Sequence, residues 1–159
     1  MADKKFLLRA AEQQEQEGSF SHPWNERSLV RGTMLGKILG LKRTGVSILH
    51  LASGKESFVY HSHHSEEEWM YILSGRGIAE IDGAEYEVGP GDFMAFPTPS
   101  VAHHLKNPFD AELIYLVGGE NLETEIADFP RLGKRMIRKK DAIEIVDHAD
   151  IKPFGPLAE

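Results

Sequence analysis

The chain contains no cysteine among its 159 residues. Disulfides, zinc ribbons and thiol chemistry are therefore excluded, and any metal site must use histidine, carboxylate or water as its ligands. Positive charge is also scarce, because the formal net charge is −7 and the only basic block runs from Arg131 to Lys140. Nucleic acid is for this reason not an expected partner.

Long apolar runs are missing as well. No segment approaches the ~20 apolar residues that a membrane-spanning helix requires, and the first residues lack the basic-then-apolar pattern of a secretory signal. We therefore expect a cytoplasmic protein without membrane association. A chain of this length fits one domain, which can bury ~70% of the surface of its unfolded state.

Between residues 33 and 118 the chain consists of short apolar segments separated by Gly, Pro, Asn and Asp. This pattern is typical of an all-β sandwich or barrel, and no helical periodicity interrupts it. The Asp82-Gly83 pair predicts a hairpin with a type I′ turn. The expected strands are Met34 to Leu39, Val46 to Leu51, Phe58 to His63, Glu68 to Leu73, Ile78 to Ile81, Ala84 to Val88, Phe93 to Phe96, His103 to Lys106 and Leu113 to Val117.

The composition changes on both sides of this region. We expect residues 1–32 to form an N-terminal arm, 33–118 a β-barrel, and 119–159 a C-terminal extension that packs on the barrel or on a partner subunit. Ala142 to Val146 predicts a short strand with Ile143 and Ile145 pointing inward. The basic run Arg131 to Asp141 is interpreted as a solvated face or as the rim of a subunit contact.

The chemically distinctive stretch runs from His61 to Gly75. His61 and His63 are two residues apart, so on a strand their side chains point to the same side. A run of three glutamates, Glu66 to Glu68, follows, and a second histidine pair, His103-His104, lies about forty residues further on. Three histidines and one carboxylate indicate a site for one divalent transition metal: Fe, Mn, Ni, Co or Zn. The cation would neutralise a carboxylate whose burial otherwise costs several kcal/mol.

The strand that begins at Glu68 has two apolar faces. If Glu68 points inward, so do Met70 and Ile72, and the opposite face carries Trp69, Tyr71 and Leu73. That outer face must be covered by another sheet, by the terminal arm or by a second subunit, and we expect a homodimer. On the inner side we expect a mainly apolar substrate pocket formed by Met70, Ile72, Phe93 (or Met94) and Phe96.

Two motifs resemble those of the cupin superfamily. His61-x-His63-x4-Glu68-x6-Gly75 is similar to the first cupin motif, although Gly54 stands one residue further from His61 than is usual. Gly91-Asp-Phe-Met-Ala-Phe-Pro97 followed by His103-x3-Asn107 is similar to the second. It departs at Pro99, where a glycine is usual, and by one extra residue before His103.

The resemblance implies a fold and a set of metal ligands. The fold is the double-stranded β-helix, or jelly-roll barrel, here with N- and C-terminal extensions. The implied ligands are His61, His63, Glu68 and His103. Spacing and strand parity agree in preferring Glu68 to Glu67 and His103 to His104.

Further segments look like a group of bacterial single-domain cupins of mostly unassigned activity, some of which are labelled sugar-phosphate isomerases. These segments are Gly118-Gly-Glu, Val101-Ala-His-His-Leu and Phe129-Pro-Arg-Leu-Gly-Lys-Arg135. A phosphorylated sugar would need basic side chains converging on it. The only basic residues of the motif region, Lys55, Arg76 and Lys106, suit turn or edge positions better, which disfavours that substrate.

Two functions remain open from the sequence. One is a metal-dependent enzyme that acts on a small polar chelating substrate as an oxygenase, an isomerase or a lyase, using the two positions that four protein ligands leave open. The other is a non-catalytic small-molecule-binding module in which the metal is structural or anchors the ligand.

Overall fold

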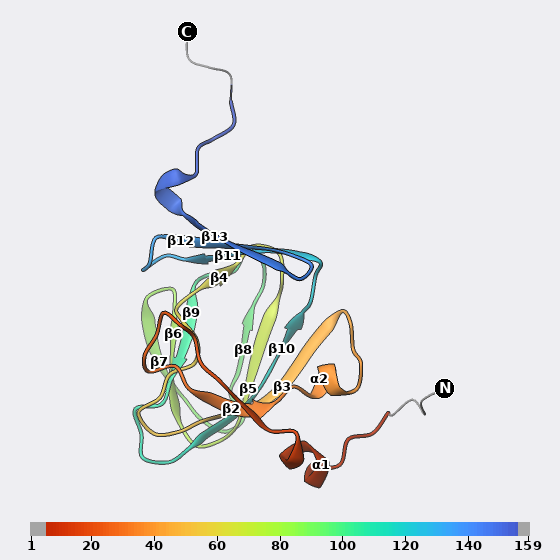
Figure 1. The fold of residues 1–159 in the computed structure, drawn as a ribbon. Coiled ribbons are helices and arrows are strands. Elements are labelled where there is room, and N and C mark those ends of the chain that lie inside the picture. The colour runs from red at the N-terminus through yellow and green to blue at the C-terminus, as the bar shows by residue number, and fades with distance from the viewer. Residues whose placement is uncertain (1–5, 156–159) are drawn as a thin grey trace, which may run out of the picture.

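Antiparallel strands dominate the computed structural model, which describes residues 6–155 (Figure 1). The expected all-β fold is confirmed. The helical elements are α1 (Ala10–Glu15), α2 (Leu35–Ile38) and the 3-10 helix η1 (His148–Asp150). The strands are β1 (Gly18–Phe20), β2 (Val30–Thr33), β3 (Thr44–Leu51), β4 (Ser62–His63), β5 (Glu68–Ser74), β6 (Gly77–Ile81), β7 (Ala84–Val88), β8 (Phe93–Phe96), β9 (His103–Lys106), β10 (Leu113–Glu120), β11 (Thr124–Phe129), β12 (Lys134–Lys139) and β13 (Ala142–Asp147).

Two sheets enclose the core. The larger sheet has the strand order β1-β2-β3-β10-β5-β8, and the smaller one has the order β7-β6-β9. Alternate residues of the strands in both sheets point between them, and the apolar core includes Leu49, Ile72, Ala79, Leu105 and Leu113. This two-sheet arrangement is the jelly-roll architecture that the motifs imply.

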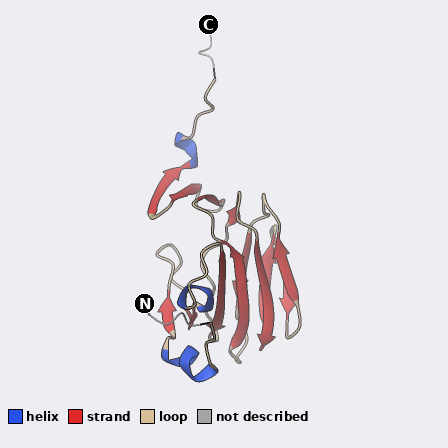
Figure 2. Cartoon of the chain, turned by 90° about the vertical axis from the view of Figure 1, so that its right-hand side faces the viewer, coloured by secondary structure: helices blue, strands red, loops and turns tan. Residues whose placement is uncertain are grey.

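A third sheet lies across one end of these two, with the order β13-β12-β11-β4 (Figures 1 and 2). Its innermost pair joins the C-terminal extension to the barrel, because Ala127 of β11 is paired with His63 of β4, and Asp128 with Ser62. The extension therefore packs on the barrel through backbone hydrogen bonds. The outermost residues of both extensions, 1–5 and 156–159, lie outside the described residues.

Glycine permits two of the reversals that position the strands. Asp82 and Gly83 have φ angles of 50° and 79°, which confirms a turn with both central residues in the left-handed region. Gly75 follows directly after β5 and has a φ angle of +76°. A Cβ atom at this position would lie 2.1 Å from the carbonyl oxygen of Glu112. Any larger residue at position 75 would therefore collide with the backbone beside β10.

The structure corrects the expected first strand. Met34 to Leu39 was expected to be extended, but Leu35–Ile38 forms the short helix α2, and the strand of this region is Val30–Thr33. Gly36 packs this helical turn closely on β3, since a Cβ atom there would lie 3.1 Å from the amide nitrogen of Val46. One helical turn is too short for periodicity to reveal.

Two smaller expectations also fail. The strand expected over Phe58 to His63 is reduced to Ser62–His63, with a single bridge between His61 and His103. Ile143 and Ile145 are 62% and 45% exposed rather than inward, because β13 is the edge strand of its sheet.

Among the described residues, no helix is long and apolar enough to cross a membrane.

The basic run is also more structured than a solvated face. Arg135 forms two hydrogen bonds with Asp128, at 2.7 and 2.8 Å, and both side chains are largely shielded from solvent. Arg138 pairs with the buried Glu66. Strand β12 thus directs part of its positive charge inward, toward carboxylates of β11 and of the loop after β4.

Candidate metal centre

The four side chains that the sequence singles out as metal ligands lie together at one end of the barrel. His63 belongs to β4, Glu68 begins β5, His103 begins β9, and His61 stands just before β4. One ligand atom from each of the four lies within 4.8 Å of all the others. The fold therefore brings the set together from segments up to forty-two residues apart in the sequence (103 minus 61).

The separations match those of ligands on a shared ion. His61 Nε2 and His63 Nε2 are 3.1 Å apart, and Glu68 Oε2 lies 3.0 Å from His63 Nε2 and 3.3 Å from His103 Nε2. With metal–ligand bonds of about 2.1 Å, neighbouring ligands of an octahedral ion are separated by roughly 3 Å and opposite ones by roughly 4 Å. The distance of 4.0 Å between His61 Nε2 and Glu68 Oε2 is close to the second value.

The imidazole tautomers favour a cation at this point. His61 Nδ1 lies 2.6 Å from the carbonyl oxygen of Val59, and His103 Nδ1 lies 3.1 Å from that of Val101. Because a carbonyl oxygen only accepts, both Nδ1 atoms must carry the proton, and in the neutral rings both Nε2 atoms present lone pairs. Two lone pairs and the Glu68 carboxylate therefore converge, and a metal ion fits such a group of acceptors.

The surroundings of His61 and Glu68 favour the forms of these two side chains that bind metals. The pKa of His61 is lowered to about 4, chiefly by desolvation; the nearby His103 and His63 rings act in the same direction, and Glu68 opposes them. Burial acts to raise the pKa of Glu68, but the contacts with the His103 and His63 rings outweigh it and hold that pKa well below its usual range. The ligand set thus consists of a neutral His61 imidazole and an ionised carboxylate at neutral pH.

The rejected alternatives lie elsewhere. His104 does not belong to the four-residue group, and its Nε2 atom is 3.7 Å from Glu56 Oε2. Glu67 is exposed. We expected Glu66, as a glutamate not used by the metal, to be a solvated residue of the rim, but it is only 7% exposed. Its carboxylate accepts a hydrogen bond from the backbone of Leu122 at 2.6 Å and pairs with Arg138.

A cavity of about 230 Å³ adjoins the four candidate ligands on the inside of the barrel. Its remaining walls are mainly apolar and include Leu49, Phe58, Met70 and Val117. Among the described residues that line it, none is an arginine or a lysine. A ligand in this cavity would contact the metal-binding residues at one end and mainly hydrocarbon elsewhere, beside Ser57, His104 and Tyr115.

The four expected pocket residues have different positions. Met70 lines the cavity, whereas Ile72 is fully buried in the core. Phe96 is buried and stacks on the His103 ring, with centroids 3.7 Å apart and planes at 10°. Phe93 does not belong to the pocket, because it is 61% exposed. Strand alternation in β8 turns Met94 and Phe96 inward and Phe93 outward, next to Trp69 at 6.3 Å between ring centroids.

The sequence interpretation missed two inward-facing residues near the site. Tyr115 of β10 is 1% exposed and lines the cavity. Glu125 of β11 is 1% exposed and lies beside His63. Strand alternation could have indicated Glu125, since Glu125, Ala127 and Phe129 are buried at every second position of β11.

Comparison with known proteins identifies the family of this chain. Residues 47–119 match the family described as Cupin domain. A crystal structure of a "putative sugar phosphate isomerase" from Acidithiobacillus ferrooxidans superposes with a TM-score of 0.89 and 35% identity, covering 94% of this chain and 96% of that chain. A sugar phosphate isomerase from a cupin superfamily, from Silicibacter pomeroyi, gives a TM-score of 0.73 and 25% identity over 80% and 81% of the two chains.

A curated sequence relative is an uncharacterized protein of Methanocaldococcus jannaschii, 40% identical over 47 residues. That match covers 30% of this chain and spans 37% of the length of the relative. The fold, the family match and the similarity over nearly the whole length of the Acidithiobacillus protein together show that this chain belongs to the cupin superfamily.

Proposed function

We propose that the protein is a metal-dependent enzyme in which His61, His63, Glu68 and His103 hold one divalent transition metal. The observation that carries the proposal is the convergence of buried lone pairs and a carboxylate beside an internal cavity. Fe, Mn, Ni, Co and Zn all accept this ligand set, and an octahedral ion would keep two positions for a chelating substrate or dioxygen. The metal would supply Lewis acidity there. The reaction class is oxygenation, isomerisation or a lyase step.

The cavity favours a small substrate without a phosphate group. Its lining offers apolar contacts from Leu49, Met70 and Val117, and no cationic side chain to hold a phosphate. The name of the Acidithiobacillus relative suggests a sugar phosphate. The chemistry of the lining instead supports a substrate without a charged group outside the two oxygen atoms that chelate the metal.

Tyr115 is the group that we expect to orient such a substrate. Burial, together with the charge of Glu68, raises the pKa of Tyr115 well above its ordinary value. The phenol therefore keeps its proton at neutral pH and remains a hydrogen-bond donor. Donors placed in a mainly apolar cavity are the features that select one orientation of a ligand.

A second copy of the chain is the proposed protein partner. The outer face of β5 and β8 carries Tyr71, Leu73 and Phe93, which are 39%, 39% and 61% exposed. Trp69 lies on the same face, against Phe93. An apolar surface of this kind is typical of an interface, and a homodimer would cover it. We also propose that the protein is located in the cytoplasm and that it binds neither nucleic acid nor a membrane.

Metal analysis of the purified protein tests the site first. Wild-type protein and a His148→Ala control should contain the same metal, whereas His61→Ala and Glu68→Ala should lose it. His148 is a suitable control because it pairs with Asp128 and does not belong to the four-residue group. Unchanged metal content in both site variants would show that the site is wrong.

Substrate tests follow with the metal-loaded protein. Oxygen-uptake and isomerase assays with chelating acids and sugars should give turnover that disappears in Glu68→Ala. Tight binding of such compounds without any turnover would instead favour the non-catalytic binding module.

A further inference from the structure

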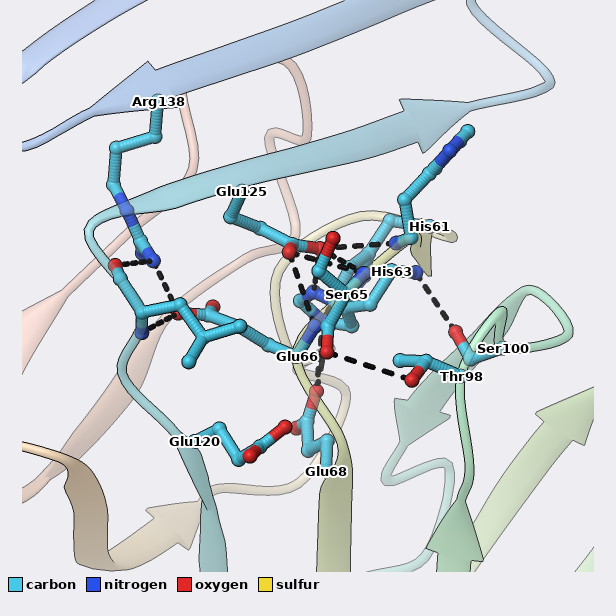
Figure 3. A network of polar contacts seen from close by, with 12 residues as sticks. His61, His63, Ser65, Glu66, Glu68, Thr98, Ser100, Glu120, Glu125 and Arg138 are labelled. Atoms are coloured by element: carbon cyan, nitrogen blue, oxygen red, sulfur yellow. Dashed lines mark hydrogen bonds and ion pairs between the residues drawn. The ribbon is translucent and has the colours of Figure 1, made fainter.

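Glu125 connects the C-terminal sheet to the loop that joins two of the candidate ligands. Its side chain is fully shielded from solvent. The carboxylate accepts backbone hydrogen bonds from His64 at 3.0 Å, from Ser65 at 3.1 Å and from Glu66 at 3.0 Å (Figure 3). These three residues lie between His63 and Glu68. One buried carboxylate thus holds the backbone of the segment that connects the candidate ligands His63 and Glu68.

The same carboxylate lies against the far side of the His63 ring. His63 Nδ1 is 3.4 Å from Glu125 Oε1, and it is buried without a hydrogen-bond partner among the described residues. The other ring nitrogen, Nε2, faces Glu68 and His61. A carboxylate beside Nδ1 favours the tautomer that carries its proton there, which leaves the lone pair on Nε2. His61 and His103 obtain the same tautomer from backbone carbonyls, whereas His63 has only Glu125.

A second metal ion is a poorer explanation of this cluster. His63, Glu66 and Glu125 do place ligand atoms within 4.8 Å of one another. However, Glu125 already accepts three backbone hydrogen bonds, and Glu66 pairs with Arg138 and accepts from Leu122. Carboxylates with this many donors have little need of a further cation.

We propose that Glu125 is a positioning residue of the metal centre, which orients the His63 ring and holds the segment between His63 and Glu68. The inference rests on the proposed metal site and extends it to a strand outside the matched Cupin domain. The pairing of Ala127 with His63 supports the same conclusion, because β11 is hydrogen-bonded directly to the strand that carries the ligand. The C-terminal sheet is in this view a part of the metal site.

The test compares Glu125→Gln with Glu66→Gln and Glu144→Gln. Glu66 is a buried carboxylate of the same loop whose hydrogen bonds go to Leu122 and Arg138, and Glu144 is exposed on β13. Affinities for Zn²⁺ and Co²⁺ are measured by competition with a chromophoric chelator, well below the unfolding temperature of each metal-free variant. We expect Glu125→Gln to lose about 10- to 100-fold in affinity, and both control variants to stay within about threefold of wild type.

Equal losses in Glu125→Gln and Glu66→Gln would overturn the proposal, because they would indicate only a loosened loop. So would an unchanged affinity in Glu125→Gln.

A second readout needs no metal. The ring ¹⁵N shifts of His63 report whether Nδ1 carries a proton in the metal-free protein, and we expect Nδ1–H in wild type and a weaker Nδ1–H population in Glu125→Gln. If wild type binds neither metal, the proposed function fails. The ¹⁵N shifts would still decide whether Glu125 determines which nitrogen of the His63 ring carries the proton. The same Nδ1–H population in both proteins would refute the role of Glu125.

Discussion

Replacing Gly75 by alanine should be far more damaging than replacing Gly54, although both glycines have nearly the same backbone conformation. Their φ angles are +76° and +72°. A Cβ atom at position 54 would meet nothing within 4 Å, whereas one at position 75 would lie 2.1 Å from Glu112 O and 2.9 Å from Leu113 Cα. The pair therefore separates the cost of the left-handed conformation from the cost of a collision.

The magnitudes follow from these two terms. A left-handed alanine costs about 1–2 kcal/mol, and this is the whole expected loss for Gly54→Ala. Forcing an extra carbon into a packed site adds about 1–3 kcal/mol, so Gly75→Ala should lose about 2–5 kcal/mol. The lower entropy of the unfolded chain favours both variants equally and cancels from the comparison. Against a typical total of about 5–15 kcal/mol, the loss at Gly75 is large.

Urea denaturation of the two variants and wild type measures these losses. Melting temperatures should fall by roughly 2–4 °C for each kcal/mol in a domain of this size. Gly75→Ala should also weaken metal binding, since position 75 follows directly on the strand that begins at Glu68. Equal destabilisation by the two substitutions would refute the argument from the Glu112 collision.

Three further predictions concern charge, ligand and assembly. Hydrogen bonding to Arg131, against some opposition from burial, lowers the pKa of Glu80 to about 2. A lowered carboxyl pKa contributes stability that is complete above the ordinary value of about 4.3 and is lost as the pH falls toward 2. Arg131→Met should therefore remove about 1–2 kcal/mol at pH 7, allowing for the exposure of the arginine, and little at pH 2, as acid-dependent melting would show. Tyr115→Phe should weaken the binding of a small chelating probe such as acetohydroxamate about 5- to 20-fold, by calorimetry, with the metal content unchanged; equal affinity would remove its orienting role. Phe93→Ser should convert a dimer into a monomer in light scattering, and a wild-type monomer would contradict the proposed interface.

The sequence predicted the barrel well because strand alternation and turn residues are local signals. The three strands β7, β8 and β9 have the expected bounds, and the turn at Asp82-Gly83 has the expected backbone. The candidate ligands were selected by spacing and parity, which again are local. The prediction that Phe93 lines the pocket was wrong by one residue, since its neighbour Met94 is the one that faces inward.

What the sequence did not reveal depends on contacts between distant segments. Glu125 stands in an acidic stretch, and only the pairing of β11 with β4 shows that it faces His63. Arg138 and Glu66 are separated by seventy-two residues, and neither carries a local signal of burial. The helix α2 is a single turn whose conformation depends on close packing against β3.

The pairing of β4 with β11 has a consequence for the order of events during synthesis. The ribosome releases His61, His63, Glu68 and His103 before it releases Glu125, and the matched Cupin domain ends at residue 119. Until β11 emerges, the segment after His63 lacks its carboxylate, and its three backbone N–H groups must bond to water. We therefore expect a nascent chain to gain full metal affinity only after β11 has docked, which makes the last quarter of the chain a checkpoint for metal loading.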